Sequence, residues 1–289
     1  MKLKFKPLSC RFIAEHTCFW MMLLFLTVGC TARLYQRASE GEERSVPSGA
    51  YPAASGRIFQ YSADKEKKYR AGDREIPIYC VKTEKPQAAL SFDAAWGNEE
   101  TGLLLEILNR HGVKATFFMT GGWVKQYPED VKAIAAAGHD LGNHSETHKN
   151  MSRLSREEIR TEISRVHEQV KRLTGKDMEL FRPPYGDYDD DVIEIADSLG
   201  YYPVQWDVDS LDWKDYGADA IVSQILNHPH LGNGSIILMH NGAKYTPEAL
   251  EAVITGLQEK GLELVPISAL IWPEGYHIDP EGRQISNSH

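Results

Sequence analysis

Short apolar runs alternate with helical patterns in this 289-residue sequence from Gln87 onward. The runs have the length and composition of buried strands, and the segments between them repeat apolar residues at steps of three and four. Because a strand, a helix and a second strand in succession form a parallel pair, the alternation predicts an α/β fold with a parallel sheet. We expect strands over residues 88–92, 115–119, 139–142, 178–181, 202–206, 235–239 and 262–265.

The clearest predicted helix begins after Ser155, where Glu158 three residues later completes a capping box. Its apolar residues follow one face as far as Gly175, a residue that suits the left-handed end of a helix. Similar patterns, each followed by a glycine, predict helices over residues 103–108, 131–137, 192–199 and 250–257. A barrel and a doubly wound sheet both fit this succession, and both place ligands at the carboxyl ends of the strands.

The first 32 residues have the composition of a signal peptide or membrane anchor. Basic residues at positions 2, 4, 6 and 11 precede an almost unbroken apolar run over residues 18–29. Residues 26–30 resemble a lipoprotein processing box, although Thr27 stands where leucine is usual. Lipidation, ordinary cleavage and an uncleaved anchor remain open. Each of them predicts an extracytoplasmic protein of the cell envelope that meets the membrane through this segment.

The rest of the chain divides into three parts by composition. Residues 33–86 are rich in small, charged and proline residues and predict a spacer that ends in a short strand. Residues 87–275 carry the strand and helix patterns of the folded domain, and residues 276–289 read as a polar tail. Only Cys80 of the four cysteines lies beyond the N-terminal segment, so no internal disulfide is expected there.

The charge of the chain narrows its partners. The formal net charge is -9 and the sequence pI is about 5.7. Nucleic-acid binding needs a broad basic face, so we expect no nucleic-acid partner. No sequence pattern indicates the oligomeric state.

Polar residues follow the predicted strands at one end. They are Asp93 after the first strand, Asn143 and His144 after the third, Arg182 after the fourth, Asp207 and Asp209 after the fifth, and His240 after the sixth. In a parallel α/β fold these strand ends meet on one side of the sheet. The sequence therefore predicts a single functional site built from several loops.

The histidines in these positions suggest metal binding and acid catalysis. His144 and His148 are four residues apart, so both imidazoles can face one cation, and neutral imidazole suits zinc and similar metals. In a chain with 11 histidines such a pair also arises by chance. His240 ends an apolar run and needs a charged partner, and Asp207 or Asp209 could supply one and raise its pKa toward acid function.

Arg182 opens the sequence Arg-Pro-Pro-Tyr-Gly. The two prolines stiffen the turn, which would hold the guanidinium at a strand end, ready to bind a carboxylate. An exposed arginine in a surface loop is the simpler alternative. Trp96 and Trp206 near the same rim could stack on a sugar face or pack in the core, and Trp213 could form a wall of the site.

Five motifs together resemble those of the polysaccharide deacetylases with the NodB-homology domain, also called carbohydrate esterase family four. They are Ser-Phe-Asp ending at Asp93, His-Ser-Glu-Thr-His from His144 to His148, Arg-Pro-Pro-Tyr-Gly from Arg182, Asp-Ser-Leu-Asp-Trp from Asp209 to Trp213, and Leu-Met-His ending at His240. The resemblance covers residues 87–272 in the family's order and spacing. The form Phe-Asp-Ala-Ala-Trp-Gly of the first motif is most similar to the sporulation-associated branch.

The resemblance implies a distorted (β/α)7-type barrel and metal-dependent removal of acetyl groups from N-acetylated sugars. With the tether, it implies cell-wall glycan, above all peptidoglycan, as substrate, and a role in sporulation. It implies these residue roles: His144 and His148 bind a divalent metal such as zinc, Asp93 is the catalytic base, Arg182 orients it, the Tyr185 amide stabilises the oxyanion, His240 is the acid and Asp209 is its partner. From their positions alone, we also expect Trp96, Trp206 and Trp213 to be candidates for substrate contact.

The chain departs from the family's usual first motif at one position. A second aspartate, the third metal ligand, is usual where this chain has Ala94. Two imidazoles alone hold zinc weakly. Asp93 itself, Asn143, Glu99 or waters could complete the site. Alternatively the metal is absent and the protein binds glycan or a partner during spore or wall assembly. A hydrolase of another amide is a third possibility.

Overall fold

The computed structural model describes residues 69–287. The expected signal or anchor segment and most of the expected spacer lie outside the described residues. Within residues 69–287, no helix is both long enough and apolar enough to span a bilayer.

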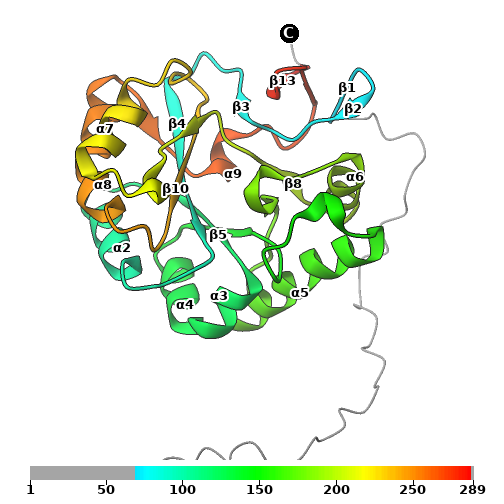
Figure 1. Cartoon of the computed structure of the whole chain (residues 1–289). Helices are drawn as coiled ribbons and strands as arrows, with labels where there is room; N and C mark the ends of the chain where they lie inside the picture. The colour runs from blue at the N-terminus through cyan, green and yellow to red at the C-terminus, as the bar shows by residue number, and fades with distance from the viewer. Residues whose placement is uncertain (1–68, 288–289) are drawn as a thin grey trace, which may run out of the picture. The chain divides into compact units, whose positions relative to one another are not determined.

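A curled sheet of parallel strands forms the centre of the domain (Figure 1). Its strands lie in the order β8-β7-β6-β5-β4-β10-β9. The strands are β4 Gln87–Ala94, β5 Thr116–Met119, β6 Asp140–Asn143, β7 Leu180–Phe181, β8 Tyr202–Pro203, β9 Val208–Asp209 and β10 Ile236–His240, and β11 Glu263–Leu264 pairs with the start of β4. The expected α/β class is confirmed. The curl makes the sheet a half-barrel, which confirms the barrel and excludes the open, doubly wound sheet.

Helices cover the outside of this sheet, as Figure 1 shows. They are α2 Thr101–Arg110, α3 Gly121–Gln126, α4 Pro128–Ala136, α5 Arg156–Thr174, α6 Asp190–Ser198, α7 Ala218–Leu226, α8 Thr246–Glu259 and α9 Ile267–Leu270. The predicted capping box of α5 is confirmed, because Ser155 and Glu158 bond to each other's backbone amides, and Gly175 ends the helix at φ 72°. The helices α3, α7 and α9 were not expected from the sequence.

A small second sheet joins the two ends of the described chain. The strand β3 Cys80–Val81 pairs with β13 Arg283–Ser286, which pairs with β12 Tyr276–Ile278. The segment expected as a polar tail therefore contributes two strands. A hairpin of β1 Arg70–Ala71 and β2 Arg74–Glu75 precedes β3.

The residues before and within β3 run across the barrel. Ile78 bridges to Val204 just after β8, and the amide of Val81 donates to the carbonyl of Gly234 just before β10. Gly234 has φ 84°, and a Cβ at this position would lie 1.7 Å from the Val81 oxygen, so the crossing requires glycine. The last part of the expected spacer thus belongs to the folded domain and links strands at both sides of the half-barrel.

Candidate active site

The loops after β4, β6, β7, β9 and β10 meet at the carboxyl ends of the strands. Asp93 and His240 end the neighbouring strands β4 and β10 and are partners in their register. His144 follows β6, and Arg182 follows β7. The structure therefore brings these four sequence-predicted residues together, because parallel strands present their ends on one side.

Asp93 and Arg182 form a buried ion pair. The Arg182 Nη1 donates to Asp93 Oδ1 at 2.8 Å, and Nη2 donates to Ser91 Oγ at 2.9 Å and to the Gln205 carbonyl at 3.0 Å. Burial would raise the pKa of Asp93, but the charge and hydrogen bond of Arg182, together with the nearby imidazoles of His144 and His240, outweigh it and the pKa is lowered. Asp93 is therefore a carboxylate at neutral pH, with one oxygen bound and its other oxygen turned toward His144.

His144 is fixed by its neighbours. Its Nδ1 lies 2.7 Å from the Arg182 carbonyl oxygen, which can only accept, so Nδ1 carries the proton. The Nε2 lone pair then faces Asp93 Oδ2 at 3.4 Å. His144 Nε2 is therefore an acceptor atom that is available to a metal ion. A metal-binding histidine is commonly oriented through its second nitrogen in this way.

His148 lies beside His144, with ring centroids 5.0 Å apart. Burial lowers the pKa of His148 to about 4, and burial also lowers the pKa of His144. Both imidazoles are therefore neutral at pH 7, the form that binds a metal. The His148 ring also packs against Tyr185, at 4.5 Å between centroids.

The loop that carries both histidines is tied to α5. Ser145 and His148 have left-handed backbones, at φ 65° and 56°. The His148 amide donates to Ser145 Oγ at 3.1 Å. Glu162 of α5 accepts from the amide of Thr147 at 2.7 Å and from its hydroxyl at 2.6 Å. These bonds hold a strained loop conformation that the sequence pattern did not reveal.

No third metal ligand joins the two imidazoles within residues 69–287. Ala94 is fully buried and has no donor atom. Asn143 donates to the Ile163 carbonyl and to Tyr201 and accepts from the Ser145 amide, so the expectation that it could complete the site is wrong. The Glu99 carboxylate bonds to the Asn98 amide. The described residues contain no group of three histidine, cysteine or acidic side chains in metal-binding geometry.

His144 and His148 can therefore bind a divalent metal through their two imidazoles, and the Asp93 carboxylate lies beside them. A typical catalytic zinc site has three protein ligands. We expect weaker metal binding than in such a site.

His240 is paired with Asp212, and the expectation that Asp209 is its partner is wrong. His240 Nδ1 lies 2.6 Å from Asp212 Oδ1, and the His240 amide donates to Asp212 Oδ2 at 2.7 Å. Burial would lower the pKa of His240, but the hydrogen bond and charge of Asp212, together with the charges of Asp93 and Asp209, outweigh it and the pKa is raised. Thr246 at the start of α8 also donates to Asp212 Oδ2, at 2.6 Å.

The turn after β9 explains why the nearer aspartate in the sequence is not the partner. Asp209 accepts from the amide of Leu211 at 2.9 Å, and Leu211 is left-handed at φ 54°. This turn brings the Asp212 carboxylate within hydrogen-bonding distance of His240. Asp207, the other candidate, accepts from Ser235 and Ile236 at the beginning of β10. Asp212 belongs to the same Asp-Ser-Leu-Asp-Trp motif as Asp209, so the motif pointed to both aspartates as possible partners of His240.

The aromatic residues around the site have different surroundings. Trp96 is 43% exposed and its ring lies 5.2 Å from that of His240. Tyr185 and Trp213 are exposed, and Tyr185 is left-handed at φ 61°. Trp206 is half-buried and lies 5.6 Å from the Arg182 guanidinium. Trp206 therefore packs against the buried arginine, whereas the other three residues present surface to solvent.

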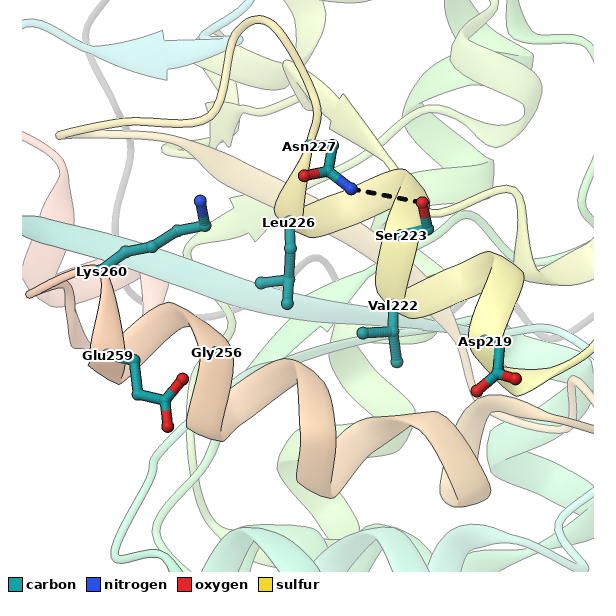
Figure 2. Close-up of a pocket in the computed structure, with 8 residues that line it drawn as sticks. All are labelled: Asp219, Val222, Ser223, Leu226, Asn227, Gly256, Glu259 and Lys260. Carbon is teal, nitrogen blue, oxygen red and sulfur yellow. Dashed lines mark hydrogen bonds between the residues drawn. The ribbon is translucent and has the colours of Figure 1, made fainter.

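A separate hollow lies away from these residues, between α7 and α8 (Figure 2). Its volume is about 430 Å³. Val222 and Leu226 form its apolar part, and Asp219, Glu259 and Lys260 are among its polar residues. The two helices approach closely there, because a Cβ on Gly256 would lie 2.4 Å from Leu226. None of the sequence-predicted site residues lines this hollow.

A family model described as polysaccharide deacetylase matches residues 81–204. Among curated proteins, the chain is 38% identical over 195 residues to the uncharacterized protein YlxY of Bacillus subtilis. The matched residues cover 68% of this chain and 60% of YlxY. It is 35% identical over 190 residues to a peptidoglycan-N-acetylglucosamine deacetylase of Bacillus cereus. That match covers 64% of this chain and 68% of the enzyme. The chain thus spans less than two thirds of the length of YlxY.

Among solved structures, the chain is similar to a CE4 family pseudoenzyme from Bacillus anthracis. The TM-score is 0.65 and the identity is 38%, over 67% of this chain and 68% of that chain. A mutant of the pseudoenzyme, 39% identical to this chain and with the same TM-score, is described as having restored enzymatic activity.

Proposed function

The chain belongs to the polysaccharide deacetylase family, and on this premise we propose that it removes acetyl groups from N-acetylated sugars of cell-wall polysaccharide, with peptidoglycan as substrate. One observation carries the proposal. An ionised carboxylate, Asp93, and an imidazole with a raised pKa, His240, stand on adjacent strand ends, each paired with a buried charge. Amide hydrolysis needs a base and an acid placed in this way.

Asp93 acts as the base in this proposal. Arg182 holds one of its oxygens and keeps its pKa low, so the carboxylate is available to accept a proton from the attacking water. Because Arg182 is itself held by Ser91 and Gln205, the carboxylate has a fixed direction.

His240 acts as the acid. Its Nδ1 is held by Asp212, so Nε2 is the atom that can donate a proton to the leaving amine. The raised pKa of His240 supports the protonated form that this step requires. The Tyr185 amide is proposed to stabilise the oxyanion, and Trp96 and Trp213 to line the sugar.

A divalent metal held by His144 and His148 would polarise the acetyl carbonyl and lower the pKa of the attacking water. The experiment measures bound metal and the acetate released from N-acetylglucosamine oligomers and from peptidoglycan. Acetate release that requires added metal and is lost in His240→Ala supports the proposal. Absence of acetate at saturating zinc, with His240→Ala indistinguishable from the parent, contradicts it.

A second candidate function is glycan binding without hydrolysis. Ala94 at the position of the third ligand favours it, as does the similarity to a pseudoenzyme. Saturable binding of glycan with no acetate release at any zinc concentration would favour this function over deacetylation.

We also propose that the protein acts outside the cytoplasm, tethered by its N-terminal segment, and in sporulation. The basic and apolar residues of the first 32 positions support the tether, and the form of the first motif supports the sporulation role. Recovery of the chain in the soluble cytoplasmic fraction contradicts the tether. Spores with unchanged glycan acetylation after deletion of the gene contradict the sporulation role.

A further inference from the structure

Most of the exposed large apolar residues are aromatic and lie on loops that also carry residues of the candidate site. Within residues 69–287 the exposed large apolar residues are Trp96, Tyr185, Trp213, Tyr216 and Leu103. The four aromatic residues lie on loops after β4, β7 and β9, and only Leu103 lies on a helix. Exposed aromatic faces grouped at one place mark a binding surface, and they suit the apolar faces of sugars.

Two of these residues belong to one loop, which we call the 211–216 arm. A 3-10 turn, η3 Asp212–Lys214, is flanked by Leu211 and Asp215, both left-handed at φ 54° and 55°. Asp212 is fully buried and holds the base of the arm to β10 and α8. Trp213 and Tyr216, which are 53% and 70% exposed, are therefore presented outward from an anchored base.

Lys214 lies near both of these rings. Its Nζ is 5.1 Å from the centroid of Trp213 and 6.0 Å from that of Tyr216. The lysine is exposed, and within the described part of the chain no carboxylate lies within 4.0 Å of its Nζ. Asp209 is close enough for an electrostatic interaction with this ammonium group but forms no ion pair with it. The arm thus combines two aromatic faces with an exposed ammonium group that can pair with an anion.

We propose that the 211–216 arm is a subsite for a sugar that carries a carboxylate, next to the N-acetylated sugar at His240. The arm adjoins the reacting centre because Asp212, which precedes Trp213, bonds to His240. Trp213 and Tyr216 stack on the sugar, and Lys214 pairs with the carboxylate. The inference rests on the proposed function, because it takes the substrate to be a glycan bound at this site.

Two sources can supply the carboxylate, and the probes separate them. One is the acid attached to the sugar itself, as in the lactyl ether of muramic acid. The other is a peptide joined to that sugar. Calorimetry with the full chain in detergent uses a neutral N-acetylglucosamine tetramer, a peptide-free glycan of alternating N-acetylglucosamine and N-acetylmuramic acid, and the same glycan with peptide stems.

We expect one or both acidic probes to bind about two- to fivefold more tightly than the neutral tetramer at low salt, the range of an exposed ion pair. The preference should shrink as salt is added. Lys214→Gln should remove the preference and leave affinity for the neutral tetramer unchanged. Lys260→Gln, an exposed lysine at the hollow between α7 and α8, is the matched control and should keep the preference.

Equal affinity for neutral and acidic probes overturns the inference, as does a preference that survives in Lys214→Gln or the absence of any binding. The readout is independent of catalysis. A carboxylate preference without acetate release leaves the subsite standing while the proposed deacetylase function fails. Acetate release with equal binding of all probes overturns the subsite and leaves the proposed deacetylase function standing.

Discussion

Asp93 and His240 are register partners on the adjacent parallel strands β4 and β10, so the proposed base and acid are fixed relative to each other by the sheet. Asp93 is paired with the buried guanidinium of Arg182, and His240 is hydrogen-bonded to the buried carboxylate of Asp212. Neither pair includes Ala94. The acid and base geometry is therefore independent of the position at which the metal site is incomplete.

The first prediction concerns Ala94→Asp, which adds a carboxylate at the end of β4. We expect zinc affinity to rise at least about tenfold, because the two neutral imidazoles gain a charged third ligand. Without metal, the variant should be less stable than the parent, since a second carboxylate is buried beside Asp93. Thermal unfolding with and without zinc, together with metal titration, measures both effects.

Ala94→Asn is the matched control for this change. It has the size of the aspartate without its charge, so it should gain little zinc affinity and show no rescue by metal. Equal zinc affinity in the parent and in Ala94→Asp would mean that His144 and His148 do not form the metal site.

The second prediction separates the two aspartates near His240. Asp212→Asn should lower the pKa of His240, because the carboxylate that raises it is lost. The pairing adds stability below the unfolded histidine pKa of about 6.5, and this contribution disappears as pH rises through the folded pKa. Asp212→Asn should therefore lose most stability on the acid side of that range. NMR titration of the His240 ring measures the pKa directly.

Asp209→Asn is the control, because Asp209 bonds to the Leu211 amide and not to His240. It should shift the pKa of His240 in the same direction by a smaller amount. A larger shift in Asp209→Asn than in Asp212→Asn would contradict the assignment of the partner.

Local patterns predicted much of this fold. The capping box at Ser155 and the left-handed Gly175 depend on residues close in sequence, and both occur as expected. The strand ends at Asp93 and His240 follow from apolar runs and from the rule that parallel strands present their ends on one side.

Features that depend on distant contacts were missed. The pairing of β13 with β3 joins segments some 200 residues apart, and no local pattern distinguishes such strands from a polar tail. The selection of Asp212 over Asp209 depends on the left-handed backbone of Leu211, a residue type that gives no sign of this conformation. The six-residue helix α3 is too short for apolar periodicity.

The third prediction concerns acid stability and His139. This side chain is 3% exposed, its Nδ1 accepts from the Ala115 amide, and burial lowers its pKa to about 4. Between pH 6.5 and 4 the unfolded chain binds a proton that the folded protein does not, so stability falls as pH falls, by at most about 1.4 kcal/mol per pH unit. His139→Gln should flatten this dependence in urea unfolding measured from pH 7 to 4.5.

His277→Gln is the control, because His277 is exposed on β12. It should leave the dependence on pH as it is in the parent. His148 also has a pKa of about 4, so it contributes to the pH dependence of stability in both variants. The effect of His139 is therefore the difference in slope between His139→Gln and His277→Gln. Identical slopes in His139→Gln and the parent would contradict the assignment of a neutral buried imidazole.

The fourth prediction concerns Glu162, which accepts two hydrogen bonds from Thr147 beside His148. In Glu162→Gln one acceptor oxygen becomes an amide nitrogen, so the Thr147 hydroxyl either loses this bond or accepts from the new NH2 group, and both bonds lose their charged acceptor. We expect a loss of about 1–3 kcal/mol in the free energy of unfolding. We also expect weaker zinc binding, because the left-handed backbone at His148 loses support. Chemical unfolding and zinc titration measure the two effects.

Glu168→Gln on the same helix is the matched control, because Glu168 is exposed. It should leave both quantities within error of the parent. A purely structural role for Glu162 would lower stability while zinc affinity, measured where each variant is fully folded, stays constant. A positioning role requires that affinity falls under those same conditions and that restoring the carboxylate with Glu162→Asp recovers part of it, since the shorter side chain can still accept from Thr147.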